Sequence, residues 1–393
     1  MKAYKRCIAI ITGTRAEYGL LRPLMSLLKS DDSIDFRLIA CAAHLSPEFG
    51  LTRNQIVEDG FVVDEDVEML LSADTPSAIA KAVGLGCIGF ADAFRRISPD
   101  LIVVLGDRFE ILAAVQAALF ARIPVAHLHG GELTEGAIDD AIRHAVTKMS
   151  HLHFVAAEAY RDRVIQMGEN PSGVFNVGAI GLDAIRGLKP EPLDGLQERF
   201  GIPADKPFLM VSWHPETLSG QSARDAFREL VAALDSRDEF VVMSYPNADQ
   251  GSRDVVFEME SFAARRRGVL LVKNFGQQAY LNIMSYASAI VGNSSSGIIE
   301  APSLGIPTVN IGDRQKGRLR AASVVDCNAN TTSILTALDR VSTPLFQEMA
   351  ARKVNPYGDG RTATRIAQKV MTIPLDHILH KRFYDIAKRS EPA

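Results

Sequence analysis

Three carboxylates close to the ends of predicted strands could perform acid–base chemistry. Asp107 follows the apolar run at residues 101–105, Glu132 follows the next such run, and Asp139 begins a predicted helix. If these acids converge, their mutual repulsion and partial burial raise some of their pKa values toward neutrality, which a general acid or base requires. Each residue also has a local explanation: Asp107 as a helix N-cap, and Asp139 as the surface partner of Arg143, four residues later on the same helix face.

A Gly/Ser-rich segment in the second half of the chain could bind phosphate. A predicted strand ends there, a turn follows and a helix begins, so hydroxyls, backbone N–H groups and the helix dipole can all meet an anion. Glu300 lies about one helical turn further along, where it can accept hydrogen bonds from a ribose diol. A serine-rich helix cap explains only one or two of these residues. The predicted set is Ser294, Ser295, Ser296 and Gly297 for phosphate, with Glu300 for the ribose.

Two further polar residues follow strand ends. Arg15 comes after Gly13, at the start of a helix, and offers a forked cationic donor for phosphate or carboxylate. This turn lacks the GxGxxG pattern, so it does not indicate a dinucleotide, and its local explanation is an ordinary turn with Arg15 in a salt bridge. His214 follows the first strand of the second half, where it could change charge near neutral pH or donate to a phosphate oxygen. The alternative for His214 is a hydrogen-bonded structural histidine.

Two His-x-His pairs raise the question of a metal. Residues i and i+2 of a strand face the same way, so His127 with His129, and His151 with His153, could each chelate. A metallophosphoesterase would also carry an Asp-x-His opening and a Gly-Asn-His-Glu box, and this chain has serines where that box needs His-Glu. We therefore predict no metal, and a structural role for the pair at 151 and 153.

The elements that must position these residues alternate between short apolar runs and segments of helical period. The strands are mostly apolar along their whole length, which is typical of a parallel sheet covered on both faces. Open parallel sheets bind ligands outside the carboxyl ends of their strands, so the pattern predicts an α/β protein with two Rossmann-like, doubly wound domains facing across a cleft. We expect strands at residues 7–12, 36–40, 101–105, 125–128 and 152–156 and then at 208–213, 240–244, 269–273, 289–291 and 308–311, with helices in the first half at 18–28, 109–121, 138–149 and 160–167.

A stretch with several glycines and prolines at residues 176–192 marks the junction between the domains. We predict an N-terminal domain with the acids at residues 1–182 and a C-terminal nucleotide-binding domain at 192–368. We expect residues 369–393 to form a C-terminal helical segment. One option is that this segment crosses back and packs on the first domain.

Composition and charge exclude several classes of protein. The 393 residues are 47% hydrophobic and 23% charged with a formal net charge of −4, so neither a biased tract nor a nucleic-acid footprint is present. We find no apolar stretch approaching the ~20 residues of a membrane span and predict no membrane partner. The four cysteines show no CxxC pair, which fits a reducing cytoplasm.

Taken in order, these segments resemble the hydrolysing UDP-N-acetylglucosamine 2-epimerase family, in particular its branch in sialic-acid and other nonulosonic-acid pathways. Each segment is short, and their order and spacing make the match specific. At residues 128–132 this chain has Leu-His-Gly-Gly-Glu where non-hydrolysing relatives carry Val-Glu-Ala-Gly, which leaves the division of roles between His129 and Glu132 open. The resemblance runs through residues 13–19, 105–108, 127–132, 213–217, 293–297 and 310–318.

The resemblance implies a GT-B type of fold and assigns roles to the candidate residues. The resemblance implies that His214 acts on the diphosphate as it leaves and that Arg143 binds the substrate. We take Asp139 and not the adjacent Asp140 as the third acid, because Asp139 lies four residues before Arg143. By similarity Arg15, His214, Ser294, Ser295, Ser296, Gly297 and Glu300 hold the diphosphate and ribose, while Asp107, Glu132 and Asp139 serve elimination and hydration.

The implied reaction needs no redox cofactor and no metal. Asp107 or Glu132 removes the proton on C2 as UDP leaves C1, and water then adds to the 2-acetamidoglucal to give N-acetylmannosamine. Alternatives are the same reaction on a UDP- or GDP-linked 2,4-diacetamido-2,4,6-trideoxyhexose, a GT-B glycosyltransferase, and a non-catalytic nucleotide-sugar sensor. The expected partner is a UDP-linked nucleotide sugar, and the resemblance implies a homodimer or homotetramer.

Overall fold

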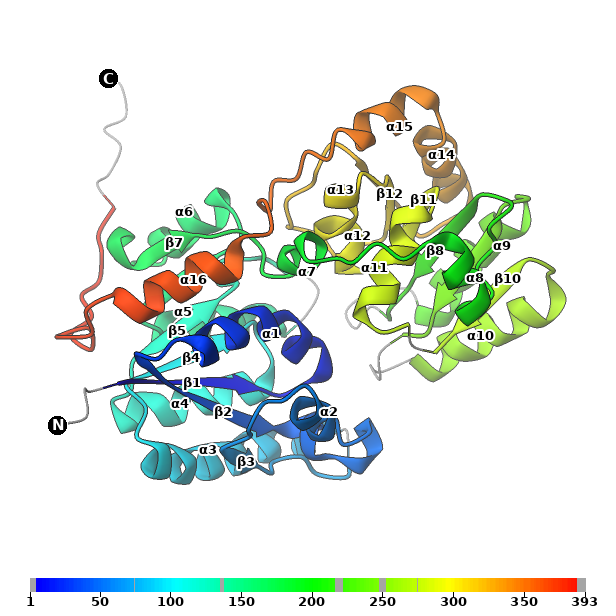
Figure 1. Ribbon diagram of the computed structural model, residues 1–393. Coiled ribbons are helices and arrows are strands. Elements are labelled where there is room, and N and C mark those ends of the chain that lie inside the picture. Colours follow the sequence, from blue (N-terminus) through cyan, green and yellow to red (C-terminus); the bar gives the residue numbers. More distant parts are fainter. Residues whose placement is uncertain are drawn as a thin grey trace, which may run out of the picture. The chain divides into compact units, whose positions relative to one another are not determined.

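The computed structural model describes residues 5–73, 75–134, 138–215, 222–246, 252–273 and 275–386. The chain forms two compact units, each built on its own parallel sheet (Figure 1). This confirms the predicted class of fold, two Rossmann-like α/β domains. Unit 1 comprises Met1–Glu132, Ile138–Asp183 and Gly360–Ala393, and unit 2 comprises Leu133–Ala137 and Ala184–Asp359.

Unit 1 contains a sheet of seven parallel strands in the order β3-β2-β1-β4-β5-β6-β7. The central strands are the predicted apolar runs, and the sequence misses the short edge strands β3 and β7. The strands are β1 (Arg6–Thr12), β2 (Ile34–Cys41), β3 (Glu65–Val67), β4 (Leu101–Leu105), β5 (Val125–Leu128), β6 (Leu152–Val155) and β7 (Val174–Asn176).

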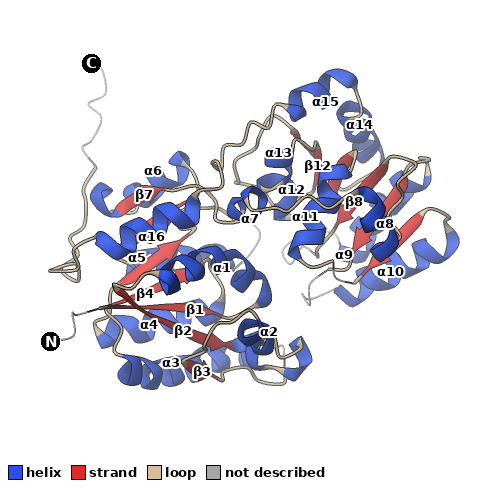
Figure 2. Cartoon of the chain, viewed as in Figure 1, coloured by secondary structure: helices blue, strands red, loops and turns tan. Residues whose placement is uncertain are grey.

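Helices cover both faces of this sheet (Figure 2). One face packs on α1 and α16 and the other on α3, α4 and α5, which explains why the central strands are apolar on both sides. The helices are α1 (Arg15–Ser30), α2 (Arg53–Glu58), α3 (Pro76–Ile97), α4 (Phe109–Ala121), α5 (Asp139–Met149), α6 (Glu158–Gln166), α7 (Leu182–Arg186, at the junction of the units) and α16 (Thr362–Thr372), with 3₁₀ turns at Ala42–Leu45, Pro47–Phe49 and Pro171–Gly173.

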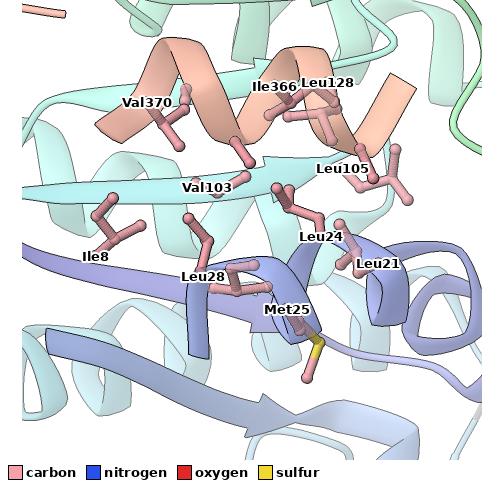
Figure 3. Packing of buried hydrophobic residues seen from close by; sticks show 14 of the residues in the cluster. Ile8, Leu21, Leu24, Met25, Leu28, Val103, Leu105, Leu128, Ile366 and Val370 are labelled. Atoms are coloured by element: carbon pink, nitrogen blue, oxygen red, sulfur yellow. The ribbon is translucent and has the colours of Figure 1, made fainter. Parts of the chain in front are cut away.

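The last described helix completes the core of unit 1. In Figure 3 the side chains of Ile366 and Val370 from α16 lie beside Leu24 and Leu28 of α1, over Val103 in the sheet. All five side chains are fully buried. The sequence predicts that the C-terminal helical segment begins at residue 369, with a return of the chain to the first domain as one option. In the structure the chain returns to unit 1 at Gly360, and α16 begins at Thr362.

Unit 2 contains six parallel strands in the order β10-β9-β8-β11-β12-β13, the strand order of a Rossmann fold. Five of these strands match predicted runs, and β13 at the edge was not expected. The strands are β8 (Phe208–Ser212), β9 (Phe240–Ser244), β10 (Val269–Val272), β11 (Ala289–Gly292), β12 (Thr308–Ile311) and β13 (Val324–Cys327).

Two layers of helices enclose this second sheet as well (Figure 2). Helices α9, α10 and α14 pack on one face, and α8, α11 and α13 pack on the other. The helices are α8 (Leu193–Phe200), α9 (Ala223–Asp235), α10 (Ser252–Arg265), α11 (Gln277–Tyr286), α12 (Ser295–Ile299), α13 (Ala301–Leu304), α14 (Thr331–Val341) and α15 (Pro344–Ala351).

Helix α3 corrects one expectation from the sequence. Its 22 residues have a mean hydropathy of 1.4 over the most apolar window, so a helix long and apolar enough to span a membrane does occur in the described chain. The buried side of α3 includes Phe90 and Phe94, which pack against the sheet of unit 1 and α4. Core helices of globular proteins pass the same test of length and composition.

Candidate functional site

The two sheets place the candidate residues at their switch points. In unit 1 the strand order reverses between β1 and β4, and Arg15 and Asp107 follow these two strands. In unit 2 it reverses between β8 and β11, which are followed by His214 and Ser294. Open α/β sheets bind ligands at the carboxyl ends of the strands where the order reverses. Each unit therefore carries its candidate residues where this class of fold binds ligands.

Arg143 of α5 connects the acids of unit 1. Its Nη2 donates to Oδ2 of Asp107, and its Nη1 donates to the backbone carbonyl oxygen of Glu132 over 2.9 Å. The Arg143 side chain is only 3% exposed, so its charge needs such partners. Oδ1 of Asp140 lies 3.6 Å from the same Nη1. The structure thus brings Asp107, Glu132 and Arg143 together beyond the ends of β4 and β5.

Asp139 lies near these groups without the ion pair that its helical spacing suggests. Among the described residues, the salt bridges of Arg143 run to Asp107 and Asp140 instead. Burial raises the pKa of Asp139, Asp107 raises it further, and Arg108 and Arg143 oppose the rise. A raised pKa keeps the carboxyl group protonated closer to neutral pH, which suits a proton donor.

The histidines of the first His-x-His pair have separate surroundings. His127 lies within β5, where its Nε2 is 2.8 Å from the carbonyl oxygen of Gly106 and its Nδ1 is 3.2 Å from Oγ1 of Thr147. Burial lowers the pKa of His127 to about 3. His129 lies beyond the strand, and its Nδ1 is 2.7 Å from Oε1 of Glu132, a residue that is 2% exposed. In the described part of the chain, no group of three or more His, Cys, Asp or Glu side chains could hold a metal ion.

A second group of charged side chains, Glu17, Glu110 and Arg108, lies next to the turn after β1. Oε2 of the buried Glu17 accepts a hydrogen bond from the Gly13 N–H over 2.6 Å, and Oε1 of the buried Glu110 accepts one from Nε of Arg108 over 2.6 Å. Burial raises the pKa of Glu17 to about 8, the Gly13 N–H opposes the rise and Glu110 adds to it. A Cβ on Gly13 would lie 2.6 Å from Cγ of Glu110, so only glycine fits the turn. Arg15 is exposed, and the described residues form no salt bridge with it.

In unit 2, Asn293 holds His214 at the switch point. The His214 N–H donates to Oδ1 of Asn293 over 2.7 Å, and Nδ2 of Asn293 donates to the His214 carbonyl oxygen over 2.8 Å. Arg314 and Gln315 both donate to the Asn293 carbonyl oxygen. Burial and then Arg314 lower the pKa of His214 to about 3, so the ring is neutral at physiological pH and does not provide the change of charge that the sequence suggests. Its Nδ1 is buried without a hydrogen-bond partner in the described residues, which leaves a polar atom for a ligand.

The serine turn is a hydrogen-bonded network that begins a very short helix. The Ser294 hydroxyl accepts from the Ser296 N–H over 3.4 Å, and Oγ of Ser296 lies 3.0 Å from Oγ of Ser294 and 2.8 Å from the Tyr280 hydroxyl. Ser295 is the first residue of α12, which has five residues, and α13 adds four after Glu300. The helix dipole is therefore weaker here than the sequence suggests. The serine hydroxyls are the main groups of this turn that can donate hydrogen bonds to a phosphate.

Two other residues of this segment face the interior of unit 2. A Cβ on Gly297 would lie 2.7 Å from Cγ2 of Thr308, so the glycine allows close packing on β12. Burial raises the pKa of Glu300 to about 7, and Arg318 opposes the rise. Oε2 of Glu300 is buried without a hydrogen-bond partner among the described residues, as an acceptor for a ligand hydroxyl would be.

Sequence patterns alone did not single out the residues that support these sites. Glu17 and Glu110 lie early in helices, where acids are common, and only their burial sets them apart. Asn293 and Arg314 belong to segments that carry the family resemblance, but their contacts depend on tertiary structure. Residues 216 and 217, also part of that resemblance, lie outside the described residues.

Comparisons with known proteins identify the family of the chain. A family model described as UDP-N-acetylglucosamine 2-epimerase matches residues 26–371. The chain is 37% identical to the GDP/UDP-N,N'-diacetylbacillosamine 2-epimerase (hydrolyzing) of Campylobacter jejuni, covering 97% of this chain and 100% of that protein. It is 36% identical to the UDP-N,N'-diacetylbacillosamine 2-epimerase (hydrolyzing) of Legionella pneumophila, with coverage of 96% and 98%.

A solved structure supports the fold. The UDP-GlcNAc 2-epimerase of Neisseria meningitidis, solved with UDP-GlcNAc bound, superimposes with a TM-score of 0.82 at 18% identity. The match covers 93% of this chain and 99% of that one. At this identity the likeness establishes the fold, which is of the GT-B-like class expected from the sequence.

Proposed function

The chain belongs to the UDP-N-acetylglucosamine 2-epimerase family, and we propose that it is a hydrolysing 2-epimerase whose substrate is a UDP- or GDP-linked 2,4-diacetamido-2,4,6-trideoxyhexose. The sequence favours UDP-N-acetylglucosamine as substrate and holds this hexose as the alternative. The names of the Campylobacter jejuni and Legionella pneumophila relatives, at 37% and 36% identity, support the alternative better. UDP-N-acetylglucosamine becomes the competing substrate.

The observation that carries the proposal is the meeting of Asp107, Glu132 and Arg143 at the carboxyl edge of the first sheet. A nucleotide-sugar transferase or sensor has little need for Asp107, Glu132 and Asp139 around one buried arginine. An elimination followed by a hydration needs one group to take a proton from carbon and another to return one on the opposite face. Asp139, with its raised pKa, supplies the second kind of group.

The proposed reaction has two steps. Asp107 or Glu132 removes the proton on C2, the C1–oxygen bond to the diphosphate breaks, and a C1–C2 double bond forms with release of the nucleoside diphosphate. Water then adds its hydroxyl to C1 while Asp139 protonates C2 on the other face, which inverts that carbon, and the proton that the water loses restores the protonated Asp139. Arg143 stabilises the ionised Asp107 through their ion pair.

Unit 2 is proposed to hold the nucleotide. The hydroxyls of Ser294 and Ser296 and the neutral ring of His214 offer hydrogen bonds to the diphosphate, and Glu300 offers an acceptor to the ribose. Arg15, exposed at the start of α1 in unit 1, is proposed to add a cation for the departing phosphate. Preorganised donors of this kind stabilise the charge that develops on the leaving group.

Proton NMR in deuterated water tests this function. The protein is incubated separately with UDP-linked and GDP-linked 2,4-diacetamido-trideoxyhexose and with UDP-N-acetylglucosamine, without an acceptor or added metal. We expect release of nucleoside diphosphate and a C2-inverted, C2-deuterated free sugar from a diacetamido substrate. Preferential turnover of UDP-N-acetylglucosamine would contradict the proposed substrate but keep the reaction, and an unlabelled sugar or no turnover would contradict the reaction itself.

The variant Asp107→Asn tests the catalytic half of the proposal. Replacing a group that takes part in proton transfer should lower kcat by about 100-fold or more, while nucleoside diphosphate affinity, measured by calorimetry, stays near wild type. Asp162→Asn, a change on helix α6, serves as a control and should retain wild-type turnover. High residual turnover of Asp107→Asn together with lost nucleotide binding would show that the assigned role is wrong.

We also propose a cytoplasmic location, from the unpaired cysteines, and a homo-oligomer, for which the resemblance implies a homodimer or homotetramer. Helices α3 and α4 leave large apolar side chains in solvent, with Ile88 67% exposed and Phe120 86% exposed. Covering such side chains is favourable, and they support a subunit interface on these helices.

A further inference from the structure

His129 has a backbone conformation that few side chains tolerate. Its φ is +65°, in the left-handed region, directly after the end of β5. Contacts between Cβ and the carbonyl oxygen disfavour this region for every residue except glycine. Two glycines follow, and Gly131 also has a positive φ, so the chain uses glycine for the rest of this turn. Such a conformation persists only where surrounding contacts hold it, and the contacts of the His129 ring are hydrogen bonds.

The hydrogen bonds of His129 define which ring nitrogen carries the proton. The backbone N–H of Ile180 donates to Nε2 over 3.3 Å, so Nε2 must be the acceptor nitrogen. The proton is then on Nδ1, which lies 2.7 Å from Oε1 of Glu132 and donates to it. The ring is thus clamped between the main chain and one carboxylate. Among the described residues, no other side chain is hydrogen-bonded to this ring.

Glu132 is in consequence held from two directions. His129 binds its carboxylate, and the guanidinium of Arg143 binds its backbone carbonyl oxygen over 2.9 Å. The same arginine binds Asp107, so a displacement of Glu132 would also change the spacing of the two acids. The glutamate side chain is 3% exposed, which leaves it few alternative positions.

We propose that His129 is a positioning residue that orients Glu132 as the base for the proton on C2, a role that rests on the proposed function above. The hydrogen bond from Nδ1 fixes the direction of the carboxylate and binds its ionised form, which is the form that takes a proton. Asp107, which is paired with Arg143, then contributes its negative charge to the site and helps to hold Arg143 and Glu132 in place. The proposal thereby divides the roles of two acids that the sequence leaves undivided.

The variants His129→Gly and His129→Asn separate orientation from backbone strain. Glycine relieves the left-handed conformation but has no donor, whereas asparagine tolerates that conformation and can place its amide N–H near the position of Nδ1. His377→Gly and His377→Asn are matched controls, because His377 is an exposed histidine with φ +61°. Thermal melts of all four variants establish that each is folded before its kinetics are compared.

We measure kcat, KM, nucleoside diphosphate affinity and the kinetic isotope effect with substrate deuterated at C2. His129→Gly should lower kcat about 100-fold, leave KM and nucleotide affinity within about two-fold, and increase the isotope effect, since removal of the C2 proton becomes slower. His129→Asn should recover kcat to within about 10-fold of wild type. The His377 variants should match wild type.

Three results would overturn the proposal: wild-type kcat in folded His129→Gly, an unchanged isotope effect despite a lower kcat, or no recovery in folded His129→Asn. Failure of the proposed function has a different signature, because wild-type protein would then release no nucleoside diphosphate from any of the three nucleotide sugars. Turnover by wild type is therefore the first measurement.

Discussion

Replacing Glu17 with glutamine should increase stability at alkaline pH relative to wild type. Burial raises the pKa of Glu17 from its ordinary value of 4.5 to about 8, beside the Gly13 N–H and Glu110. Below pH 4.5 this carboxyl is protonated in both the folded and the unfolded chain and contributes no pH dependence. Between pH 4.5 and about 8 the unfolded chain releases the proton while the folded chain keeps it, so wild-type stability falls as pH rises. Glutamine resembles the protonated acid and can still accept from Gly13.

The size of the effect follows from the shift in pKa. One unit corresponds to about 1.4 kcal/mol, so the rise from 4.5 to about 8 amounts to about 5 kcal/mol at pH values above 8. Rearrangement of the protein and entry of water around a buried charge reduce this figure, and we expect to observe about 2 kcal/mol. For a unit of this size, that free energy corresponds to about 4–8 °C in Tm.

Calorimetric melting of ligand-free protein at pH 5, 7 and 9 measures the effect. The Tm of Glu17→Gln minus that of wild type should rise by about 4–8 °C from pH 5 to pH 9. Glu58→Gln, a change at an exposed residue of α2, is the control and should follow wild type at every pH. A Tm difference that stays constant, or decreases with pH, would refute the conclusion that folded unit 1 keeps Glu17 protonated.

Three further predictions concern other parts of the chain. Gly292→Ala should destabilise unit 2 by more than about 2 kcal/mol in denaturant melts, because its Cβ would lie 2.0 Å from the Ser212 carbonyl oxygen at a φ of +135°; wild-type stability would contradict this. Lys381→Met should lower stability by about 1–3 kcal/mol, because it removes a 2.7 Å ion pair from the buried Glu169; an unchanged denaturation midpoint would show that the pair is dispensable. Phe120→Ser should shift the homo-oligomer toward monomer in light scattering without changing the circular dichroism spectrum, and an unshifted mass would exclude Phe120 from the interface.

The strands that the sequence predicts correctly are apolar along most of their length, including β10 at a sheet edge. Leu101–Leu105 has no polar residue and Phe208–Ser212 has one only at its end, as strands covered on both faces require. The missed strands β3, β7 and β13 lie at sheet edges, have only three or four residues, and are only partly buried. An edge strand depends on a neighbour for its hydrogen bonds, and a local pattern does not contain that information.

The residues of the candidate site likewise include some that the sequence identifies and some that only the structure reveals. Asp107 and His214 could be found because polar residues directly after apolar strands are conspicuous in the sequence. The left-handed backbone of His129 and its bond to Glu132 could not, since they depend on the packing of Ile180 and on a turn whose glycines allow several geometries. The partners of Arg143 could not be found either, because spacing along the helix offers both Asp139 and Asp140, and only the tertiary structure shows the ion pairs with Asp107 and Asp140.

Unit 1 is assembled from both ends of the chain, and this has a consequence for biosynthesis. The ribosome delivers β1 first and α16 among the last segments, yet both belong to one core. The second sheet is encoded without interruption within Ala184–Asp359, so all of its strands are synthesised before the helix that completes unit 1. The usual order, in which the N-terminal domain matures first, is therefore reversed here. A product that terminates before Thr362 would carry a finished second domain and a first sheet with one apolar face covered by α1 alone, and such an exposed apolar surface is the kind that chaperones and proteases recognise.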